Sequence, residues 1–281
     1  MFKTVEQCEI IYKEQIQEDI IFLRLYAPII SKNAIPGQFV HIRASSGEFP
    51  ILRRPYSLFD VGKDSIDLLI AVVGRGSTLI ANTPVGQTLD MLGPLGNGFP
   101  VQPGNYPPIF IAGGVGVAPL HYLWRQWDAQ EIRSEFLLGA SSKSRIPLPK
   151  DSPLWKKAQI ATDDGSSGYH GTVVQLFQDI INRNSQSWNH LGTVFVCGPV
   201  PMIRALMPII TLHRLSGLVS LEQTMGCGVG ACQGCAVVTS NHSASEYLLT
   251  CQDGPVFRIE DINLDYLTDH PHKREIHAIR S

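Results

Sequence analysis

Four cysteines in the C-terminal third of the chain constrain its fold more than any other feature. They follow the spacing C-x4-C-x2-C-x15-C and are Cys227, Cys232, Cys235 and Cys251. Zinc sites usually combine two separated C-x2–4-C pairs around one tetrahedral ion. A plant-type [2Fe–2S] cluster instead uses C-x4-C-x2-C followed by a distant fourth cysteine. The spacing therefore favours a [2Fe–2S] cluster over zinc, and over four cysteines that serve only packing.

Small residues fill most of the positions between the first three of these thiols. They are Gly226, Gly228, Gly230, Ala231 and Gly234. Glycine lets the backbone pass close to a cluster and turn its N–H groups towards the sulfurs, where hydrogen bonds stabilise the negative charge and tune the potential. Ordinary buried cysteines pack as small hydrophobic residues and need no such glycines. The composition of this segment supports the same interpretation.

The composition of the whole chain is typical of a globular protein of more than one domain. The chain has 281 residues, of which 44% are hydrophobic and 17% charged, with a formal net charge of −2. A length well above about 200 residues suits two domains and an appended module. The near-neutral charge and the lack of Lys/Arg runs leave no electrostatic footprint for nucleic acid, so we expect no such partner.

The apolar segments predict neither a membrane span nor a signal peptide. The longest near-apolar run, IFIAGGVGVAPL, is well short of the roughly 20 residues that cross a bilayer. The N-terminal segment MFKTVEQCEIIYKEQIQEDI carries acidic residues among its apolar ones and has no continuous hydrophobic region. We therefore expect a cytoplasmic protein, in a reducing compartment where clustered cysteines bind metal more often than they form disulfides.

The first hundred residues predict an all-β domain. Alternating or β-branched runs occur at Ile20–Ala27, Gln38–Ala44, Tyr56–Val61 and Ser65–Val73. Turn residues separate them, as at Pro36 and Gly37. Many short strands without a helical period predict a β-barrel or sandwich, and we expect it to cover residues 1–102.

The chain changes character after the Gly/Pro-rich stretch PLGNGFPVQPGNYPP. Strand-like runs then alternate with amphipathic ones, in which Leu120, Leu123, Trp124 and Trp127 show helical spacing. Such alternation indicates βαβ units around a parallel, Rossmann-like sheet, expected over residues 103–218. The cysteine segment is expected to form a small domain over residues 219–258. The charged segment 259–281, with His270, His272 and His277, is expected to be a tail.

Two segments of the β domain carry groups suited to a flavin nucleotide. Arg54, Pro55, Tyr56 and Ser57 would offer a guanidinium for a pyrophosphate, an aromatic ring for stacking and a hydroxyl for a ring edge. A second segment, GRGST, precedes a predicted helix whose free N–H groups and dipole would attract phosphate. Its members are Gly74, Arg75, Gly76, Ser77 and Thr78. Each segment alone also fits an ordinary barrel strand or helix start.

A glycine-rich turn in the α/β domain has the position of a dinucleotide-binding turn. Gly113, Gly114 and Gly116 follow a strand and precede a helix, where glycine lets the backbone approach a pyrophosphate. The third glycine of the G-x-G-x-x-G pattern is absent, because Pro119 occupies its place. Proline is compatible with the first turn of a helix, so this is a variant of the motif.

Two further segments are expected at the carboxyl edge of the same sheet, where open α/β sheets bind ligands. The first is Cys197, Gly198 and Pro199, which follow the strand-like run TVFV. The second is the pair Asp163 and Asp164, whose carboxylates could orient a ribose or nicotinamide. The alternatives are an ordinary buried cysteine and a solvated loop.

Taken in order, the segments RPYS, GRGST, GGVGVAP, DDG and CGP resemble the ferredoxin–NADP reductase-like superfamily. With the segments MGCGVGACQGCAV and CQDGPVF added, the chain resembles the electron-transfer subunit of the NAD-linked, two-subunit dihydroorotate dehydrogenases. The resemblance covers about the first 257 residues. It implies an N-terminal FAD-binding antiparallel β-barrel, an NAD-binding Rossmann-like domain and a C-terminal [2Fe–2S] domain.

The resemblance also implies a function in pyrimidine biosynthesis. An FMN-containing catalytic partner, joined in a heterotetramer, would oxidise dihydroorotate, and electrons would pass through the cluster and FAD to NAD⁺. The RPYS and GRGST residues would hold FAD, the Gly113–Gly116 turn would hold NAD, and Cys197 would lie beside the nicotinamide as the catalytic residue.

Three alternatives stay open at this point. Lys143 and Arg145 could accept a 2′-phosphate, so NADP is not excluded. The chain could instead be the diaphorase-type subunit of a hydrogenase, a sulfur reductase or a ferredoxin–NADP oxidoreductase complex. It could also be a redox-sensing or zinc-stabilised binding module without catalysis.

Overall fold

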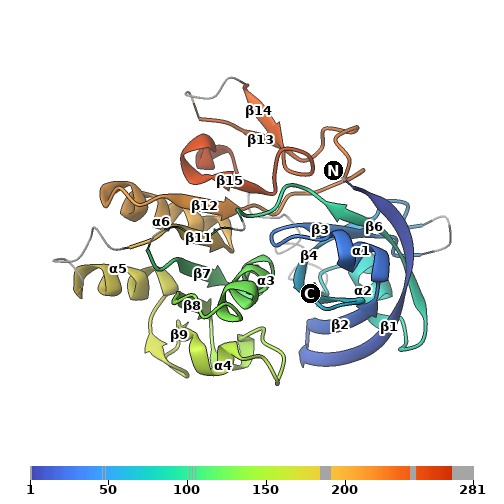
Figure 1. Ribbon diagram of the computed structural model, residues 1–281, viewed down its shortest axis with the longest axis horizontal. Helices are drawn as coiled ribbons and strands as arrows, with labels where there is room; N and C mark the ends of the chain where they lie inside the picture. The colour runs from blue at the N-terminus through green and yellow to red at the C-terminus, as the bar shows by residue number, and fades with distance from the viewer. Residues whose placement is uncertain are drawn as a thin grey trace, which may run out of the picture.

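A computed structural model describes residues 2–45, 47, 49–100, 102, 104, 106–183, 191–240 and 245–267 of the chain. In Figure 1 the barrel lies to the right, the α/β unit to the left, and the cysteine segment crosses above both. Among the described residues, no helix combines the length and the apolar character that a membrane span requires.

The N-terminal unit is a closed antiparallel barrel with the strand order β1-β2-β5-β4-β3-β6. Its strands are β1 (Thr4–Gln17), β2 (Ile20–Tyr26), β3 (Phe39–Ile42), β4 (Arg54–Val61), β5 (Ser65–Ala71) and β6 (Thr88–Leu95), and its helices are α1 (Pro28–Asn33) and α2 (Arg75–Asn82). The predicted antiparallel barrel is confirmed, and β2 to β5 match the four predicted runs.

The sequence did not predict β1 and β6. One reason is that β1 places a carboxylate, Glu6, at a buried position between Cys8 and the start of the strand. Glu6 accepts hydrogen bonds from the backbone amides of Ile29 and Ile30 at 3.0 and 2.9 Å, at the start of α1. A buried acid with a helix start as its partner interrupts the apolar alternation that identifies a strand.

The second unit is a seven-stranded sheet with the order β10-β9-β8-β7-β11-β12-β15. Its strands are β7 (Ile109–Gly113), β8 (Glu135–Ala140), β9 (Gln159–Thr162), β10 (Tyr169–His170), β11 (Val194–Cys197), β12 (Gly217–Ser220) and β15 (Val256–Arg258). Its helices are α3 (Val117–Asp128), α4 (Leu154–Lys157), α5 (Val173–Arg183) and α6 (Val200–Leu212), with short 3-10 turns η1 (Gly114–Gly116) and η2 (Lys143–Arg145). All pairings are parallel except that between β12 and β15, which confirms the predicted α/β architecture.

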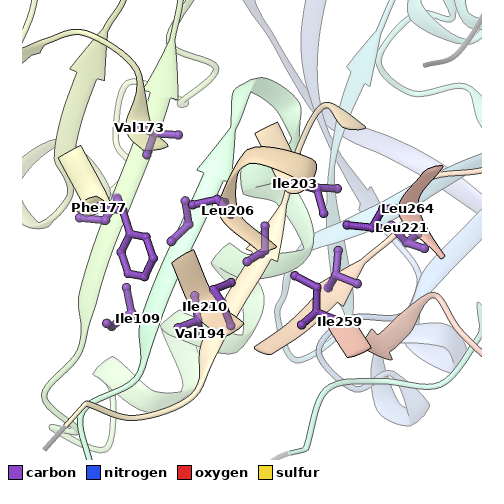
Figure 2. Packing of buried hydrophobic residues seen from close by; sticks show 14 of the residues in the cluster. Ile109, Val173, Phe177, Val194, Ile203, Leu206, Ile210, Leu221, Ile259 and Leu264 are labelled. Carbon is purple, nitrogen blue, oxygen red and sulfur yellow. The ribbon is translucent and has the colours of Figure 1, made fainter. Parts of the chain in front are cut away.

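Both faces of this sheet are buried. Ile109 and Ile111 of β7 pack with α5 and α6, as Figure 2 shows for Ile109, Phe177 and Ile210. The intervening Phe110 packs on the other face with α3. Strands covered on both sides read as continuous apolar runs, which is why β7, β8 and β11 are clear in the sequence.

The cysteine segment leaves the sheet after β12 and returns to it through β15. Between them lie the cysteine loop and a hairpin of β13 (Ala236–Val238) and β14 (Tyr247–Leu249). Two 3-10 turns follow, η4 (Ile259–Asp261) and η5 (Leu264–Tyr266). Ile259, Ile262, Leu264 and Leu267 are buried in the core beneath α6, so the expected tail packs as part of the fold up to residue 267. The histidines at 270, 272 and 277 lie outside the described residues.

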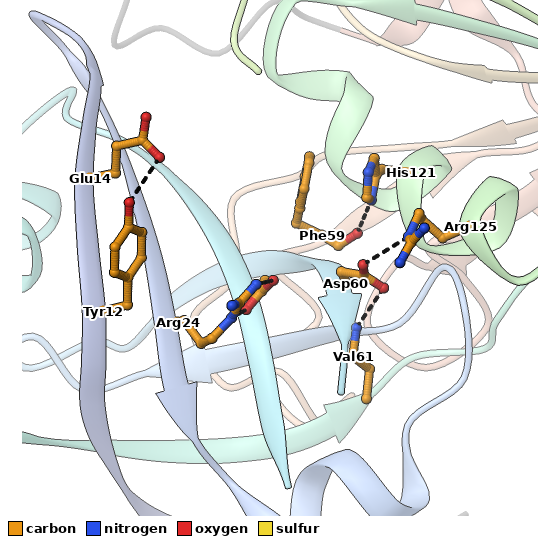
Figure 3. A network of polar contacts seen from close by, with 9 residues as sticks. Tyr12, Glu14, Arg24, Phe59, Asp60, Val61, His121 and Arg125 are labelled. Carbon is orange, nitrogen blue, oxygen red and sulfur yellow. Dashed lines mark hydrogen bonds and ion pairs between the residues drawn. The ribbon is translucent and has the colours of Figure 1, made fainter. Parts of the chain in front are cut away.

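A polar seam joins the barrel to the α/β unit (Figure 3). The ring of His121 in α3 stacks on Phe59 of β4 at 3.9 Å between centroids, and its Nδ1 donates to the Phe59 carbonyl at 2.9 Å. Arg125, one turn further along α3, contacts Asp60 at 3.4 Å. Burial lowers the pKa of His121 to about 3, so the ring is neutral at physiological pH. The seam fixes the angle between the two units, and with it the distance between their candidate sites.

Candidate functional site

The RPYS segment forms the start of β4, and its arginine meets the start of α2. A Cβ atom at Gly76 would lie 2.7 Å from Nε of Arg54. Only a glycine at this position lets the guanidinium come so close to the helix N-terminus. The positive charge of Arg54 and the positive end of the α2 helix dipole, which are distant in the sequence, thus lie at one point.

The N-terminus of α2 has open space above it. The helix is capped by Gly74, which has extended backbone, and none of the described residues has an atom within 4 Å of the position that a Cβ at Gly74 would take. The first N–H groups of a helix have no partner within it and carry a partial positive charge. Together with the Arg54 guanidinium they form a cradle whose charge and space fit a pyrophosphate, as FAD would require.

The two hydroxyls of the GRGST segment form hydrogen bonds within their own turn, and their role toward FAD stays a prediction. Ser77 Oγ accepts from the amides of Val73 and Gly74 at 2.9 and 3.0 Å and donates to the Gly74 carbonyl at 2.8 Å. Thr78 Oγ1 donates to the same carbonyl at 3.0 Å. These hydroxyls shape the turn, so the groups left for an anion are backbone amides and the side chains of Arg54 and Arg75.

The other members of the RPYS segment line the barrel surface beside this cradle. Pro55 and Ser57 lie opposite His41 and Phe39 in the register of β3 and β4. Burial raises the pKa of Tyr56, so its phenol stays protonated. A neutral phenol on a half-buried ring suits stacking and hydrogen bonding to a flavin, and this role stays a prediction.

The structure brings the two predicted nicotinamide segments into contact. A Cβ at Gly116 would lie 2.4 Å from the carbonyl oxygen of Cys197, and a Cβ at Gly198 would lie 3.0 Å from Cα of Gly113. These glycines therefore allow the β7–α3 turn to press against the end of β11. Gly114 has a φ of +53°, and no described residue has an atom within 4 Å of the position of its Cβ. Its open side leaves room for the predicted dinucleotide phosphate.

The Cys197 thiol is fully buried at the end of β11, and Pro199 caps α6 directly after it. Burial raises the pKa of Cys197 well above its ordinary value, with a smaller contribution from Glu222 in the same direction. A neutral thiol cannot act as a base or a nucleophile at physiological pH. Any role of Cys197 beside a nicotinamide is therefore one of shape, and it stays a prediction.

The two aspartates follow β9 at the same edge of the sheet. Asp164 accepts hydrogen bonds from the hydroxyl and the amide of Ser166 at 2.6 and 2.9 Å, and these bonds lower the pKa of its carboxyl. Asp163 has an exposed carboxylate, while its amide donates to Ala140 at 3.1 Å. Asp164 is thus engaged in its own turn, which leaves Asp163 as the better placed of the two for a ribose.

One of the two cations considered for a 2′-phosphate already has a partner. Arg145 makes a two-point ion pair with Asp19, with N–O distances of 2.7 and 2.8 Å. The hydrogen bonds to Asp19 raise the pKa of Arg145. Lys143 is exposed, and its amide donates to Ser166 Oγ at 2.7 Å. Because Arg145 is paired with Asp19 of the barrel, its guanidinium is less available to the 2′-phosphate that distinguishes NADP from NAD. The ion pair therefore favours NAD.

The cysteine loop directs backbone amides at three of its four sulfurs. Val229 and Cys232 donate to Cys227 Sγ at 3.4 Å each. Gly230 donates to Cys251 Sγ at 3.1 Å, and Cys251 donates to Cys235 Sγ at 3.5 Å. This is the arrangement that the glycine-rich sequence predicted, since N–H donors to thiolates stabilise an anionic cluster.

The four thiols lie as two pairs, since the Cys232 thiol acts on the pKa of Cys227 and the Cys235 thiol acts on the pKa of Cys251. Burial raises the pKa of Cys227, but the amide hydrogen bonds outweigh it and lower the value to about 7. Burial and the adjacent Cys235 raise the pKa of Cys251 to about 12. Two pairs fit the two irons of a [2Fe–2S] cluster.

One buried residue beside the cluster loop carries no sequence motif. His41 of β3 is fully buried, and a Cβ at Gly228 would lie 2.6 Å from its Nδ1. Its only signal in the sequence is a histidine within the apolar run QFVHI, which also fits a satisfied core histidine.

Comparisons with known proteins agree with this geometry. The protein-family model for the iron–sulfur cluster binding domain of dihydroorotate dehydrogenase B matches residues 222–263. The family model for the oxidoreductase FAD-binding domain matches residues 7–99. The chain therefore carries an FAD-binding domain and an iron–sulfur domain, and the predictions of both cofactors are confirmed.

Solved structures show a similar fold. The structure of an NADH-dependent reduced ferredoxin–NADP oxidoreductase, described for flavin-based electron bifurcation, superposes with a TM-score of 0.77 at 26% identity and covers 98% of each chain. A ferredoxin–NADP⁺ reductase from Neisseria gonorrhoeae with bound FAD and NADP shares the fold, with a TM-score of 0.60 at 16% identity over 75% of this chain and 91% of that one.

Curated relatives show the family. The electron transfer subunit of dihydroorotate dehydrogenase B (NAD⁺) from Desulforamulus reducens is 38% identical over 84% of this chain and 89% of its own length. The subunit of the same name from Geobacillus kaustophilus is 34% identical over 92% and 98%. The resemblance inferred from the motifs is confirmed: the chain is an oxidoreductase component that belongs to the family of dihydroorotate dehydrogenase B electron transfer subunits.

Proposed function

We propose that this chain carries electrons from a dihydroorotate-oxidising partner subunit through a [2Fe–2S] cluster and FAD to NAD⁺. One observation carries the proposal: the cysteine loop packs directly on the strand that pairs with the RPYS strand. Phe39 of β3 shares a buried cluster with Cys235 and Cys251, and it lies opposite Ser57 of β4. The packing of Phe39 supports the proposal that the cluster and the flavin are neighbours.

The exposure of the thiols supports a direction for the path. Cys232 is exposed, whereas Cys235 and Cys251 are buried against the barrel. Electrons would enter at the exposed pair, where a partner can dock, and leave from the buried pair towards the flavin. The exposed side chain of Val229 beside Cys227 adds an apolar contact for the docking face.

When bound, FAD exchanges two electrons with nicotinamide and one at a time with the cluster, so it joins the two kinds of transfer. The chain's own residues position these groups. Arg54 and the start of α2 would hold the FAD pyrophosphate, and the open side of Gly114 would admit the NAD pyrophosphate. The buried neutral Cys197 would close the end of the nicotinamide pocket against water. The electrons that arrive from the cluster carry no proton, so one proton must also be taken up from solvent for each hydride passed to NAD⁺.

The same proposal includes a partner and a location. The partner is an FMN-containing dihydroorotate dehydrogenase catalytic subunit, assembled with this chain as a heterotetramer of two copies of each. The cytoplasm is the proposed compartment, because four closely spaced reduced thiols are needed for cluster assembly.

The test is anaerobic. The tagged chain is recovered from its native cells, and the visible flavin and cluster bands are recorded before and after addition of dihydroorotate. Bleaching that disappears when the partner is removed by high salt would support the proposal, and NADH serves as the positive control for the cofactors. A sample that NADH bleaches and dihydroorotate does not would overturn the dihydroorotate assignment. That outcome would favour the diaphorase-type alternative, which the full-length likeness to the ferredoxin–NADP oxidoreductase supports.

A further inference from the structure

His41 lies on the outer face of the barrel, between the candidate flavin strand and the cluster loop. Its neighbours Val40 and Ile42 point into the barrel core, whereas Phe39 packs on the buried cysteines. His41 is on the same side of β3 as Phe39, by the alternation of side chains along a strand. Its backbone lies opposite Pro55 in β4 and its side chain has no exposed surface.

The imidazole of His41 supports the turn that carries the first cluster cysteine. Gly228 has a φ of +71°, and a Cβ there would lie 2.6 Å from Nδ1 and 3.3 Å from Cγ of His41. The ring thus packs against the Cα of Gly228. The next peptide directs the Val229 amide at Cys227 Sγ at 3.4 Å. Movement of this turn towards the barrel is blocked by the ring.

The ring is polar in a place where an apolar side chain would fill the same space. Both of its ring nitrogens, Nδ1 and Nε2, are buried. Neither ring nitrogen has a hydrogen bond of normal geometry to any of the described residues. An imidazole kept buried at this cost has a function beyond packing.

We propose that His41 is a positioning residue for electron transfer between the flavin and the cluster. Its ring holds the Cys227–Val229 turn on β3, so that the Val229 amide keeps its hydrogen bond to the Cys227 sulfur. Hydrogen bonds to the sulfurs raise a cluster's potential, because they stabilise its more negative, reduced form. The residue acts through the loop that its ring contacts at Gly228. The inference rests on the proposed role of Cys227 as a ligand.

Two variants separate polarity from volume. His41→Leu fills the site without a polar atom, and His41→Asn is smaller but places a nitrogen or oxygen near the position of Nδ1. Each is prepared as the complex with its native partner. Iron and FAD contents are measured, then the EPR spectrum of the reduced cluster, and then the fraction of reduced cluster at fixed NADH/NAD⁺ ratios.

We expect His41→Leu to alter the EPR line shape and to shift the distribution of electrons from the cluster to the flavin by up to about tenfold, the effect of losing the hydrogen bond from the Val229 amide to the Cys227 sulfur. His41→Asn is expected to recover most of this shift. A wild-type spectrum and distribution in His41→Leu would overturn the inference, and so would a larger change in His41→Asn than in His41→Leu, which would indicate volume alone.

If His41→Leu holds no iron, His41→Asn decides the question. Near wild-type iron, spectrum and distribution in that variant would support the inference, and loss of iron from both would overturn it. A separate variant tests whether Cys227 is a cluster ligand at all. If it is not, Cys227→Ser would keep an unchanged cluster spectrum.

Discussion

The guanidinium of Arg54 occupies the space in which a side chain at Gly76 would have to lie, with 2.7 Å between Nε and a Cβ built on the glycine. This contact joins the start of β4 to the N-terminus of α2. It turns two weak sequence signals into one site, since a cation and a helix N-terminus at the same point attract the same anion.

Replacing Gly76 is therefore expected to weaken FAD binding. In Gly76→Ala the new methyl group displaces the guanidinium, and the loss of one charge-assisted hydrogen bond, roughly 1.5–3 kcal/mol, corresponds to a ten- to hundredfold weaker affinity. The measurement is the FAD dissociation constant from flavin fluorescence. Gly104→Ala is the matched control, because among the described residues no atom lies within 4 Å of its Cβ position. Equal affinities in the two variants would contradict the proposed pyrophosphate cradle.

Replacing a cluster cysteine is expected to remove the cluster and spare the flavin. Cys232 is exposed on the loop, far from the RPYS strand in the chain, so Cys232→Ser deletes a ligand without disturbing the barrel. Iron analysis and the visible spectrum of purified protein should show no cluster and a full complement of FAD. Cys8→Ala, which removes a thiol buried in the barrel core, serves as the control and should keep its iron. Joint loss of both cofactors in Cys232→Ser would show that the two sites do not assemble independently.

A methyl group at Gly116 is expected to separate the two nicotinamide segments. Its Cβ would lie 2.4 Å from the Cys197 carbonyl, which is backbone and cannot move aside cheaply. We expect Gly116→Ala to lose about 1–3 kcal/mol of stability and to slow the reduction of bound FAD by NADH at least tenfold. Thermal unfolding and anaerobic stopped-flow absorbance measure the two effects. Normal NADH reduction in a destabilised variant would place the nicotinamide elsewhere.

Release of Arg145 is expected to improve the use of NADPH. In Asp19→Asn the guanidinium loses its two-point partner and becomes available to a 2′-phosphate. The kcat/KM ratio of NADPH to NADH should rise several-fold, whereas stability should change by less than about 1 kcal/mol, because the pair is largely exposed. Asp128→Asn, which removes the partner of Lys157, is the control for loss of a surface ion pair. An unchanged ratio would show that Arg145 does not face the ribose.

Much of the fold could be predicted from the sequence because its signals are local. Strands β2 to β5 are short runs rich in apolar and β-branched residues. Strands β7, β8 and β11 are continuous apolar runs buried on both faces. Strand β1 was missed, since Glu6 at a core position is explained only by the start of α1, which lies far along the chain. The packing of residues 259–267 beneath α6 was also invisible, because four isolated apolar residues in a charged segment show no period.

The sequence by itself determined the cluster, since the spacing of four cysteines and the glycines between them are properties of a continuous segment that must wrap its own ligand. The order of the flavin and nicotinamide motifs likewise determined the family. The tertiary structure decided which residues of those motifs are available. It assigned Ser77, Thr78 and Asp164 to their own turns, paired Arg145 with Asp19, and buried Cys197 as a neutral thiol. It also placed His41 against Gly228. Such contacts join residues that are far apart in the chain, and their distances depend on how the barrel, the sheet and the loop pack together.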